Sequence, residues 1–250
     1  MDKKDKIGGR AYSKGLRLQN NKISVKVYYD KDDNLRIKSN PVIMNKYLKY
    51  LKKIPVIRGI ATLLLAVYSF LKEIFQNPLK YWFIFVIVLA DIIYMLMPDS
   101  TDVIYQNIFL LVYLTIPIIL FFIFRNSVSE VFKYHGAEHK AVNYYENDFE
   151  GDIGSYSVIH RRCGSNIIFY YIIISILTSF IDLGLNIYLR QVIILGLSFE
   201  LLKITPKKLL FIPSFFQKLV TKEPDQRQLE AAKLALQALI FESEHNKKIK

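Results

Sequence analysis

Two of the four histidines in this chain of 250 residues lie four positions apart, in the stretch YHGAEHKAVNYYEND from Tyr134 to Asp148. On a helix, residues i and i+4 share a face, so His135 and His139 can reach the same metal ion. Glu138 completes the pattern H-x-x-E-H, the inverted form of a zinc-protease signature. The spacing predicts two metal ligands with a glutamate beside them as general base. The alternative interpretation is a polar surface helix.

More ligand types follow within a short distance. Three of the four histidines and the only cysteine fall between positions 135 and 163, because the motif HRRCG adds His160 and Cys163 at a spacing of three. Glu146 lies between the two motifs. Two histidines with a thiolate or a carboxylate suit zinc best, and iron or manganese if carboxylates dominate. The sequence therefore predicts a divalent metal site, with His160, Cys163 or Glu146 as candidates for the third ligand.

Two functions of different classes fit this pattern. One is a metal-dependent hydrolase, in which a metal-activated water attacks the substrate and Glu138 is the general base. The other is a non-catalytic scaffold or assembly factor, in which His135, His139, His160 and Cys163 close a structural zinc site. A catalytic Cys163 and a transport function are lesser alternatives. The residues alone do not identify a substrate.

Composition points to a membrane protein. Apolar residues make up 52% of the chain, with 17 Phe and 17 Tyr, and they concentrate in the runs 81–97, 105–124 and 167–202. A helix needs about 20 apolar residues to cross a bilayer. The third run is interrupted by a polar turn at 182–186, so the pattern predicts four membrane spans. One long helix with a re-entrant piece is the alternative.

Charge sets the expected orientation. Residues 1–53 hold fifteen Lys and Arg against five Asp and Glu, so they carry +10 of the net +12. By the positive-inside rule both termini and the histidine-rich segment are expected in the cytoplasm. The expected partners are the lipid bilayer and its anionic headgroups rather than nucleic acid.

The predicted fold class is mainly α: a polytopic helical membrane protein of about four spans, with a small cytoplasmic β-hairpin region at the N-terminus and a cytoplasmic C-terminal helix. Alternation of apolar and polar residues over 21–40 indicates the hairpin, and Asp225 or Thr221 can cap the C-terminal helix. The expected segments are a β-rich N-terminus (1–45), a basic interfacial or re-entrant helix (46–78), a first membrane hairpin (79–124), the cytoplasmic His/Glu/Cys loop (125–164), a second membrane hairpin (165–203) and a cytoplasmic interfacial segment with the final helix (204–250).

Four motifs in this order, PVIRGI, YHGAEHK, HRRCG and TKEPDQRQLE, resemble the YqhQ-like bacterial membrane proteins, a family described as predicted metal-dependent enzymes. The resemblance covers roughly residues 8 to 240 and implies a location in the bacterial inner membrane. It adds Glu223 and Asp225 as further site candidates, and Glu200 is another because a carboxylate near the end of a span needs a polar partner. Lys14 stands where the family pattern has a glutamate.

Overall fold

The structure is a computed structural model that describes residues 5–42, 50–78, 81–95, 103–181 and 184–248. The chain divides into two compact units. The first consists of residues 1–61 and 127–250, and the second of residues 62–126. All the candidate site residues belong to the first unit.

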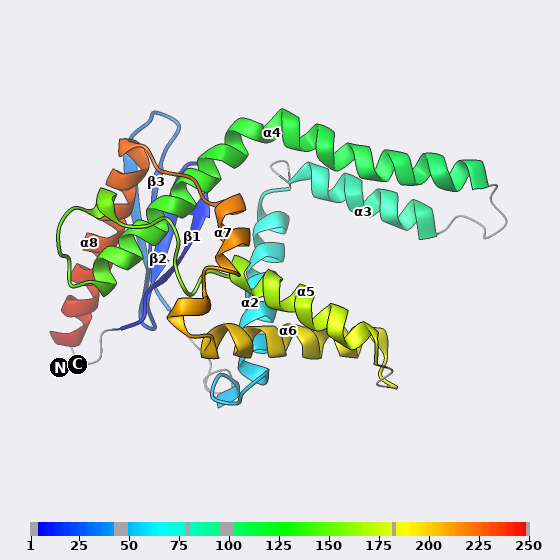
Figure 1. Ribbon diagram of the computed structural model, residues 1–250. Helices are drawn as coiled ribbons and strands as arrows, with labels where there is room; N and C mark the ends of the chain where they lie inside the picture. The colour runs from blue at the N-terminus through cyan, green and yellow to red at the C-terminus, as the bar shows by residue number, and fades with distance from the viewer. Residues whose placement is uncertain (1–4, 43–49, 79–80, 96–102, 182–183, 249–250) are drawn as a thin grey trace. The chain divides into compact units, whose positions relative to one another are not determined.

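The N-terminal part of the first unit is an antiparallel sheet. Its strands are β1 (Gly8–Tyr12), β2 (Gly15–Gln19), β3 (Ile23–Tyr29) and β4 (Leu35–Pro41), in the order β1-β2-β3-β4 (Figure 1). Apolar and polar residues alternate along β3, and every second residue is buried. A strand with this period has one face toward the core and one toward solvent. β3 and β4 lie where the alternation predicts a hairpin, but they belong to a larger sheet.

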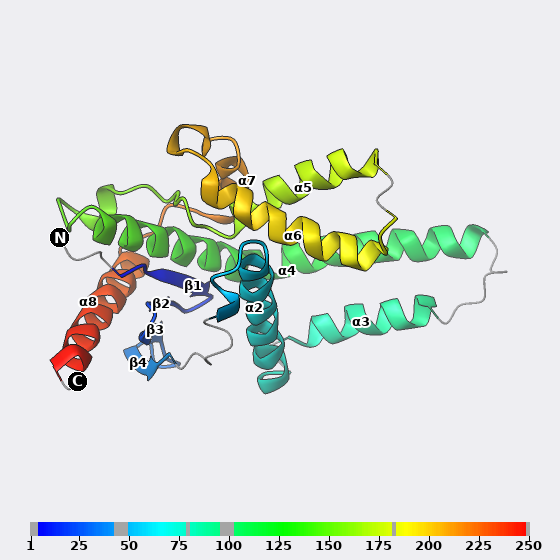
Figure 2. The same ribbon diagram turned by 90° about the horizontal axis from the view of Figure 1, so that it is seen from below.

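Two helices cover the apolar face of this sheet: the C-terminal part of α4 (Val103–Glu146) and α8 (Gln226–Lys248) (Figures 1 and 2). The helices contribute many small residues to the core, which lets their backbones approach the larger strand residues closely. The buried cluster includes Leu16, Leu18, Val25 and Val27 from the strands, Ala137, Ala141 and Val142 from α4, and Ala232, Ala235 and Leu236 from α8.

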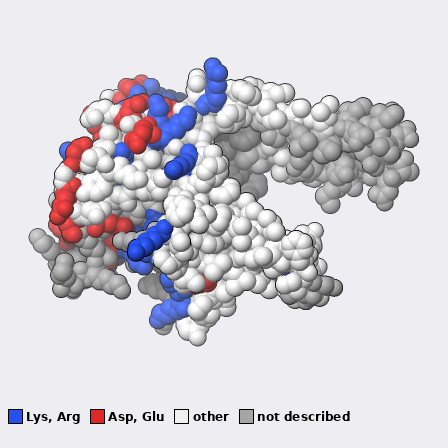
Figure 3. Space-filling view, in the orientation of Figure 1, with Lys and Arg blue, Asp and Glu red and all other residues white. Residues whose placement is uncertain are grey.

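The rest of the first unit is helical. α5 (Ser165–Ser179) and α6 (Ile187–Ile204) lie side by side as a hairpin, and α7 (Ser214–Val220) packs against α5. Two short 3₁₀ helices, η1 (Ile153–Ser155) and η2 (Lys207–Leu209), lie in the connections. Figure 3 shows that charged side chains gather on the left of the view, over α8 and the loop that follows α4, whereas the visible surface of α5 and α6 is mostly uncharged.

The second unit contains α2 (Ile57–Gln76) from residue 62 onward, α3 (Trp82–Met95) and the first part of α4. Within this unit, the Tyr81 hydroxyl donates a hydrogen bond to the Glu73 carboxylate at 2.8 Å, and Phe70 packs edge-on against the Tyr81 ring.

One finding contradicts both the predicted fold class and the predicted localisation. Among the described residues, no helix combines the length and the apolar content needed to cross a membrane. α3 has 14 residues and α5 has 15, so at about 1.5 Å per residue each falls short of a hydrocarbon core of about 30 Å. α6 has 18 residues but carries Arg190, Glu200 and Lys203. The chain is a mixed α and β protein, which contradicts the mainly α fold of about four spans and the multi-pass location in the bacterial inner membrane.

Candidate metal centre

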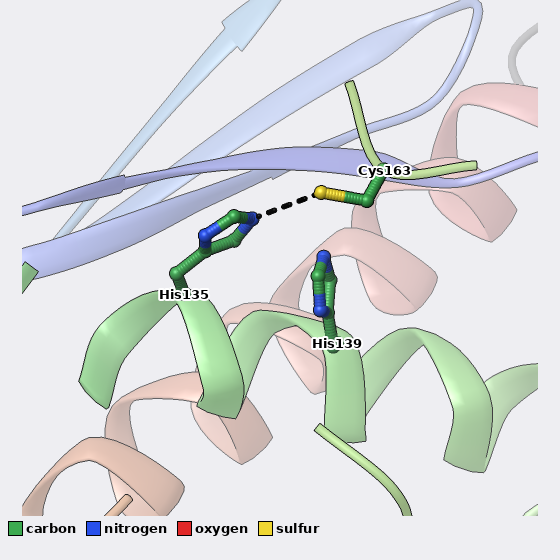
Figure 4. Close-up of side chains that lie close together, drawn as sticks. All are labelled: His135, His139 and Cys163. Atoms are coloured by element: carbon green, nitrogen blue, oxygen red, sulfur yellow. Dashed lines mark hydrogen bonds between the residues drawn. The ribbon is translucent and has the colours of Figure 1, made fainter. Parts of the chain in front are cut away.

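Three candidate ligands, two histidines and a cysteine, converge where α4 passes the loop before α5. His135 and His139 project from successive turns of α4, and Cys163 faces them from the loop (Figure 4). One ligand atom from each residue lies within 4.8 Å of the other two. The Nε2 atom of His135 is 3.5 Å from the Cys163 sulfur, and the two imidazole rings are 4.4 Å apart between centroids. Two nitrogens and a sulfur at these distances can bind one metal ion.

Backbone carbonyls orient both imidazoles. The Nδ1 of His139 donates a hydrogen bond to the Val158 carbonyl at 2.5 Å, and that of His135 to the Val220 carbonyl at 3.0 Å. A carbonyl accepts only, so each Nδ1 carries the proton and each Nε2 keeps a lone pair. Histidines that bind metals are held in this way in most metal sites, by a second hydrogen bond that fixes the tautomer and the ring.

Gly136 explains how the Val220 carbonyl reaches His135. The segment after α7 crosses α4 at this glycine, where the Lys222 amide donates to the Phe132 carbonyl at 3.0 Å. A Cβ added at Gly136 would lie 2.0 Å from the Lys222 carbonyl oxygen, which no side chain allows. The glycine of the HGAEH motif therefore makes room for the chain that orients the first histidine.

Glu138 is buried beside the cluster. Its side chain is 9% exposed, and its Oε2 lies 3.9 Å from the Nε2 of His135. Burial raises the pKa of the carboxyl to about 7, although the charges of His135 and Arg162 oppose the shift. Within the part of the chain that the structure describes, no group donates a hydrogen bond to this carboxylate. A buried carboxylate without protein donors is costly unless water, a metal or a substrate satisfies it.

Cys163 is a buried thiol in a polar environment. Burial by itself raises its pKa, but hydrogen bonds with His139 and Ser165 and the charge of His139 lower the pKa by more. The net pKa of the thiol is below its ordinary value. The protonated His139 is the form that lowers this pKa, whereas metal binding needs the neutral His139 with a lone pair on Nε2. In a metal-bound cluster the ion itself would keep the thiol deprotonated.

His160 and Glu146, both predicted as possible ligands, form a separate pair. The Nε2 of His160 lies 3.3 Å from the Glu146 carboxylate, and its Nδ1 accepts from the Arg162 amide at 3.3 Å. Both ring nitrogens are therefore in use. The Arg162 guanidinium also pairs with Glu146 at 2.5 Å. The hydrogen bond from His160 and the charge of Arg162 lower the Glu146 pKa to about 2.

The loop that carries His160 and Cys163 is anchored through its backbone. The Gln217 side chain of α7 accepts from the His160 amide at 2.6 Å and donates to the His160 carbonyl at 2.9 Å. Gln217 is completely buried. Sequence reasoning missed this residue because nothing in the local pattern of α7 links it to the HRRCG motif.

The remaining candidates have structural partners outside the cluster. Glu200 binds the Arg58 guanidinium and accepts from the Val56 amide at 3.1 Å, which joins α6 to the start of α2. Glu223 pairs with Lys140 at 3.0 Å, and Asp225 with Lys133 at 2.5 Å. Both lysines lie on α4, so the EPD motif ties the segment before α8 to the helix that carries the histidines.

A cavity of about 170 Å³ opens next to the cluster. Its wall includes His135, Glu138 and Cys163, together with Gly8, Gly9 and Arg162. A Cβ added at Gly9 would lie 2.6 Å from the Cγ of Glu138, so this glycine makes room for the buried carboxylate. The two adjacent glycines at the start of β1 were the only hint in the sequence that this strand lines a cavity. A glycine pair alone does not indicate which other part of the chain it contacts.

Comparison with known proteins gives a family and no function. No solved structure matches this chain. The "Uncharacterized protein YqhQ" of Bacillus subtilis (strain 168) is 36% identical over 42% of this chain, and the match covers 39% of that relative's length. A family model described as "Protein of unknown function (DUF1385)" matches residues 54–242. The match confirms the predicted YqhQ-like relationship, and the chain belongs to the DUF1385 family.

Proposed function

We propose that this protein is a metal-dependent hydrolase. His135, His139 and Cys163 hold a divalent metal ion, and Glu138 is the general base. The observation that supports the proposal best is the orientation of the two imidazoles: carbonyls of Val158 and Val220 hold their Nδ1 protons, and the Nε2 atoms face the Cys163 sulfur. A set of two nitrogens and one sulfur suits zinc better than manganese or magnesium.

Three protein ligands favour a catalytic site over a structural one, since structural zinc sites have four protein ligands. The scaffold alternative needs His160 as the fourth ligand. Its two ring nitrogens are occupied by Glu146 and by the Arg162 amide, which argues for an open coordination position. When bound, the metal would supply Lewis acidity that lowers the pKa of water toward 7.

Glu138 has the placement that a general base needs. It lies on the same cavity wall as His135 and Cys163, and its carboxylate has no hydrogen-bond donor among the described residues. In the proposed reaction it takes a proton from the attacking water and returns it to the leaving group. Arg162, on the same wall, pairs with Glu146 through its guanidinium and donates its backbone amide to His160.

Metal content and turnover of an activated ester test the proposal together. Purified without chelator and supplied with zinc, the wild-type protein should hold about one equivalent and hydrolyse p-nitrophenyl acetate. His139→Ala should lose the metal and the activity, because one of three ligands is removed. Glu138→Gln should keep the metal and lose the activity. His160→Gln is the matched control, a histidine change in the same cluster of rings that should keep the zinc.

The outcomes separate the hypotheses. Zinc lost in His160→Gln would indicate a closed four-ligand site and support the scaffold function. Zinc absent from the wild-type protein would refute both metal hypotheses. Full ester hydrolysis by a zinc-loaded Glu138→Gln protein would remove Glu138 from the mechanism.

A further inference from the structure

The outer edge of β1 borders the cavity of the proposed hydrolase. β1 is the first strand in the order β1-β2-β3-β4, and no second strand pairs with its other edge in the described part of the chain. Gly8 and Gly9 on this strand are exposed and form part of the cavity wall. Edge strands with free backbone groups are sites where an extended peptide can add to a sheet.

The register identifies the backbone groups that point outward. The Tyr29 amide donates to the Lys14 carbonyl, so Gly15 directs its own backbone groups toward β1. Gly15 is paired with Tyr12, and Leu18 with Gly9. The backbone N–H and C=O groups of successive residues in a strand point to opposite sides. Tyr12 therefore points these groups toward β2, and Ala11 and Gly9, one and three residues before it, point them away from β2. The carbonyl of Ile7, the preceding group in this series, accepts from the Arg162 guanidinium at 2.9 Å.

The two edge strands of the sheet, β1 and β4, differ in whether a proline blocks pairing at their outer edge. By the same alternation, Leu35, Ser39 and Pro41 of β4 direct their backbone groups outward. Pro41 has no N–H to offer there, and proline on an edge strand is a common protection against pairing. The edge of β1 carries two glycines instead, and it is the edge that lies beside Glu138.

We propose that the substrate of this site is an extended polypeptide segment, whose backbone pairs with Gly9 and Ala11 at the outer edge of β1. This inference rests on the proposed hydrolase function. The pairing brings a peptide bond beside Glu138, whose Cγ lies against Gly9. Water adds across that bond: its oxygen bonds to the carbonyl carbon, the C–N bond breaks, and Glu138 moves one proton from the water to the leaving amine.

The size of the cavity restricts what the peptide can carry. Its volume of about 170 Å³ is small beside the roughly 300–1,000 Å³ of typical small-molecule pockets. That space accepts main chain with small side chains and excludes a folded domain. Recognition through backbone groups next to glycines predicts cleavage beside small residues with little further sequence preference.

The test measures binding apart from turnover. The probe is a fluorescein-labelled peptide of alternating threonine and alanine with a lysine at each end, and the protein is the 250-residue chain with Glu138→Gln, loaded with zinc. Fluorescence anisotropy should show binding, and the same peptide methylated at every amide nitrogen should not bind. Ala11→Pro, added to this protein, should weaken binding at least tenfold because it removes one outward N–H. Proline is tolerated at such positions, so the fold and the zinc content should remain.

Ser39→Pro is the matched control, the same change at an outward position on the opposite edge, and it should leave binding unchanged. The proposal is overturned if the unmodified peptide does not bind, if the methylated peptide binds equally well, or if both proline variants bind like the parent. If Ala11→Pro fails to fold, the methylated peptide alone decides. Ester hydrolysis that depends on Glu138 without peptide binding would refute the peptide substrate and leave the hydrolase standing. Peptide binding at this edge, together with no ester or peptide hydrolysis by the zinc-loaded wild-type protein, would refute the hydrolase and leave β1 as a peptide-binding edge only.

Discussion

At the scale of single residues, hydrogen bonds separate metal ligands from their neighbours. His135, His139 and His160 lie close together, with the rings of His139 and His160 5.8 Å apart. In the first two, a carbonyl holds Nδ1 and Nε2 faces Cys163, whereas the two nitrogens of His160 face Glu146 and the Arg162 amide. The chemistry of three identical side chains is thus decided by the groups that each ring faces.

Gly9 allows a test of the position of Glu138. Gly9→Ala places a Cβ within 2.6 Å of the Cγ of Glu138 and of the Arg17 carbonyl oxygen, so both the carboxylate and the pairing of β1 with β2 at this point must shift. A displacement of about 1 Å in a catalytic group can reduce turnover about 100-fold. We expect ester hydrolysis to fall by this order while zinc content, measured by elemental analysis, stays at the wild-type level.

Gly8→Ala is the control for this experiment, since a Cβ at Gly8 meets nothing within 4 Å. It should keep wild-type turnover. Equal losses in the two variants would mean that the strand, and not the contact with Glu138, determines the effect.

At the scale of elements, α4 is both a core helix and the support of the metal ligands. Its alanines pack against the sheet and α8, and its histidines face the loop before α5. Lys133 and Lys140 on the same helix bind Asp225 and Glu223 before α8. Lys140 is buried and also donates to the carbonyls of Gly154 and Tyr156. These contacts fix the two segments that supply the orienting carbonyls.

The crossing at Gly136 leads to a prediction about metal affinity. Gly136→Ala puts a Cβ 2.0 Å from the Lys222 carbonyl oxygen, so the segment from Val220 to Lys222 must move off α4 and His135 loses its partner. Loss of such a second hydrogen bond typically reduces metal affinity by about 10–100-fold. Zinc titration against a competing chelator measures this loss.

Gly164→Ala provides a comparison, because a Cβ at Gly164 has open space around it. Its zinc affinity should match that of the wild type. An unchanged affinity in Gly136→Ala would show that the Val220 carbonyl does not contribute to metal binding.

At the scale of the whole molecule, stability should depend on pH through Glu146. This residue at the end of α4 pairs with His160 and Arg162 of the loop before α5, and its pKa falls from 4.5 to about 2 in the folded chain. A carboxyl with a depressed pKa stabilises the fold above its unfolded pKa, and this contribution is lost as the pH falls through the folded value. The wild type should therefore melt at a higher temperature than Glu146→Gln above pH 5, and the difference should disappear between about pH 4.5 and 2.

Calorimetry in the presence of chelator measures this difference without interference from metal release. Glu150→Gln replaces an exposed glutamate nearby and should follow the wild-type profile. A difference for Glu146→Gln that stays constant down to pH 2 would mean that the charge of this carboxylate does not account for its effect.

Local patterns were sufficient for several elements. The alternation over 21–40 predicted paired strands where β3 and β4 lie, and the capping signal at Asp225 or Thr221 predicted a C-terminal helix where α8 packs on the sheet. The fold prediction from apolar composition was wrong because a run of apolar residues does not show where the helix that contains it begins and ends. It therefore does not show which charged residues belong to that helix. The helices in the described residues are too short or too polar to cross a membrane.

Helix geometry alone brings His135 and His139 to one helix face with Glu138 between them in the chain, because residues three and four apart are neighbours on a helix. The path of the chain outside this helix brings Cys163 to them and pairs His160 with Glu146 instead. Cys163 is 28 residues from His135, and its approach depends on how the loop is held by Gln217. The carbonyls of Val158 and Val220 and the edge of β1 carry no side-chain signature at all, since backbone groups are the same at every residue and acquire a role only through the path of the chain.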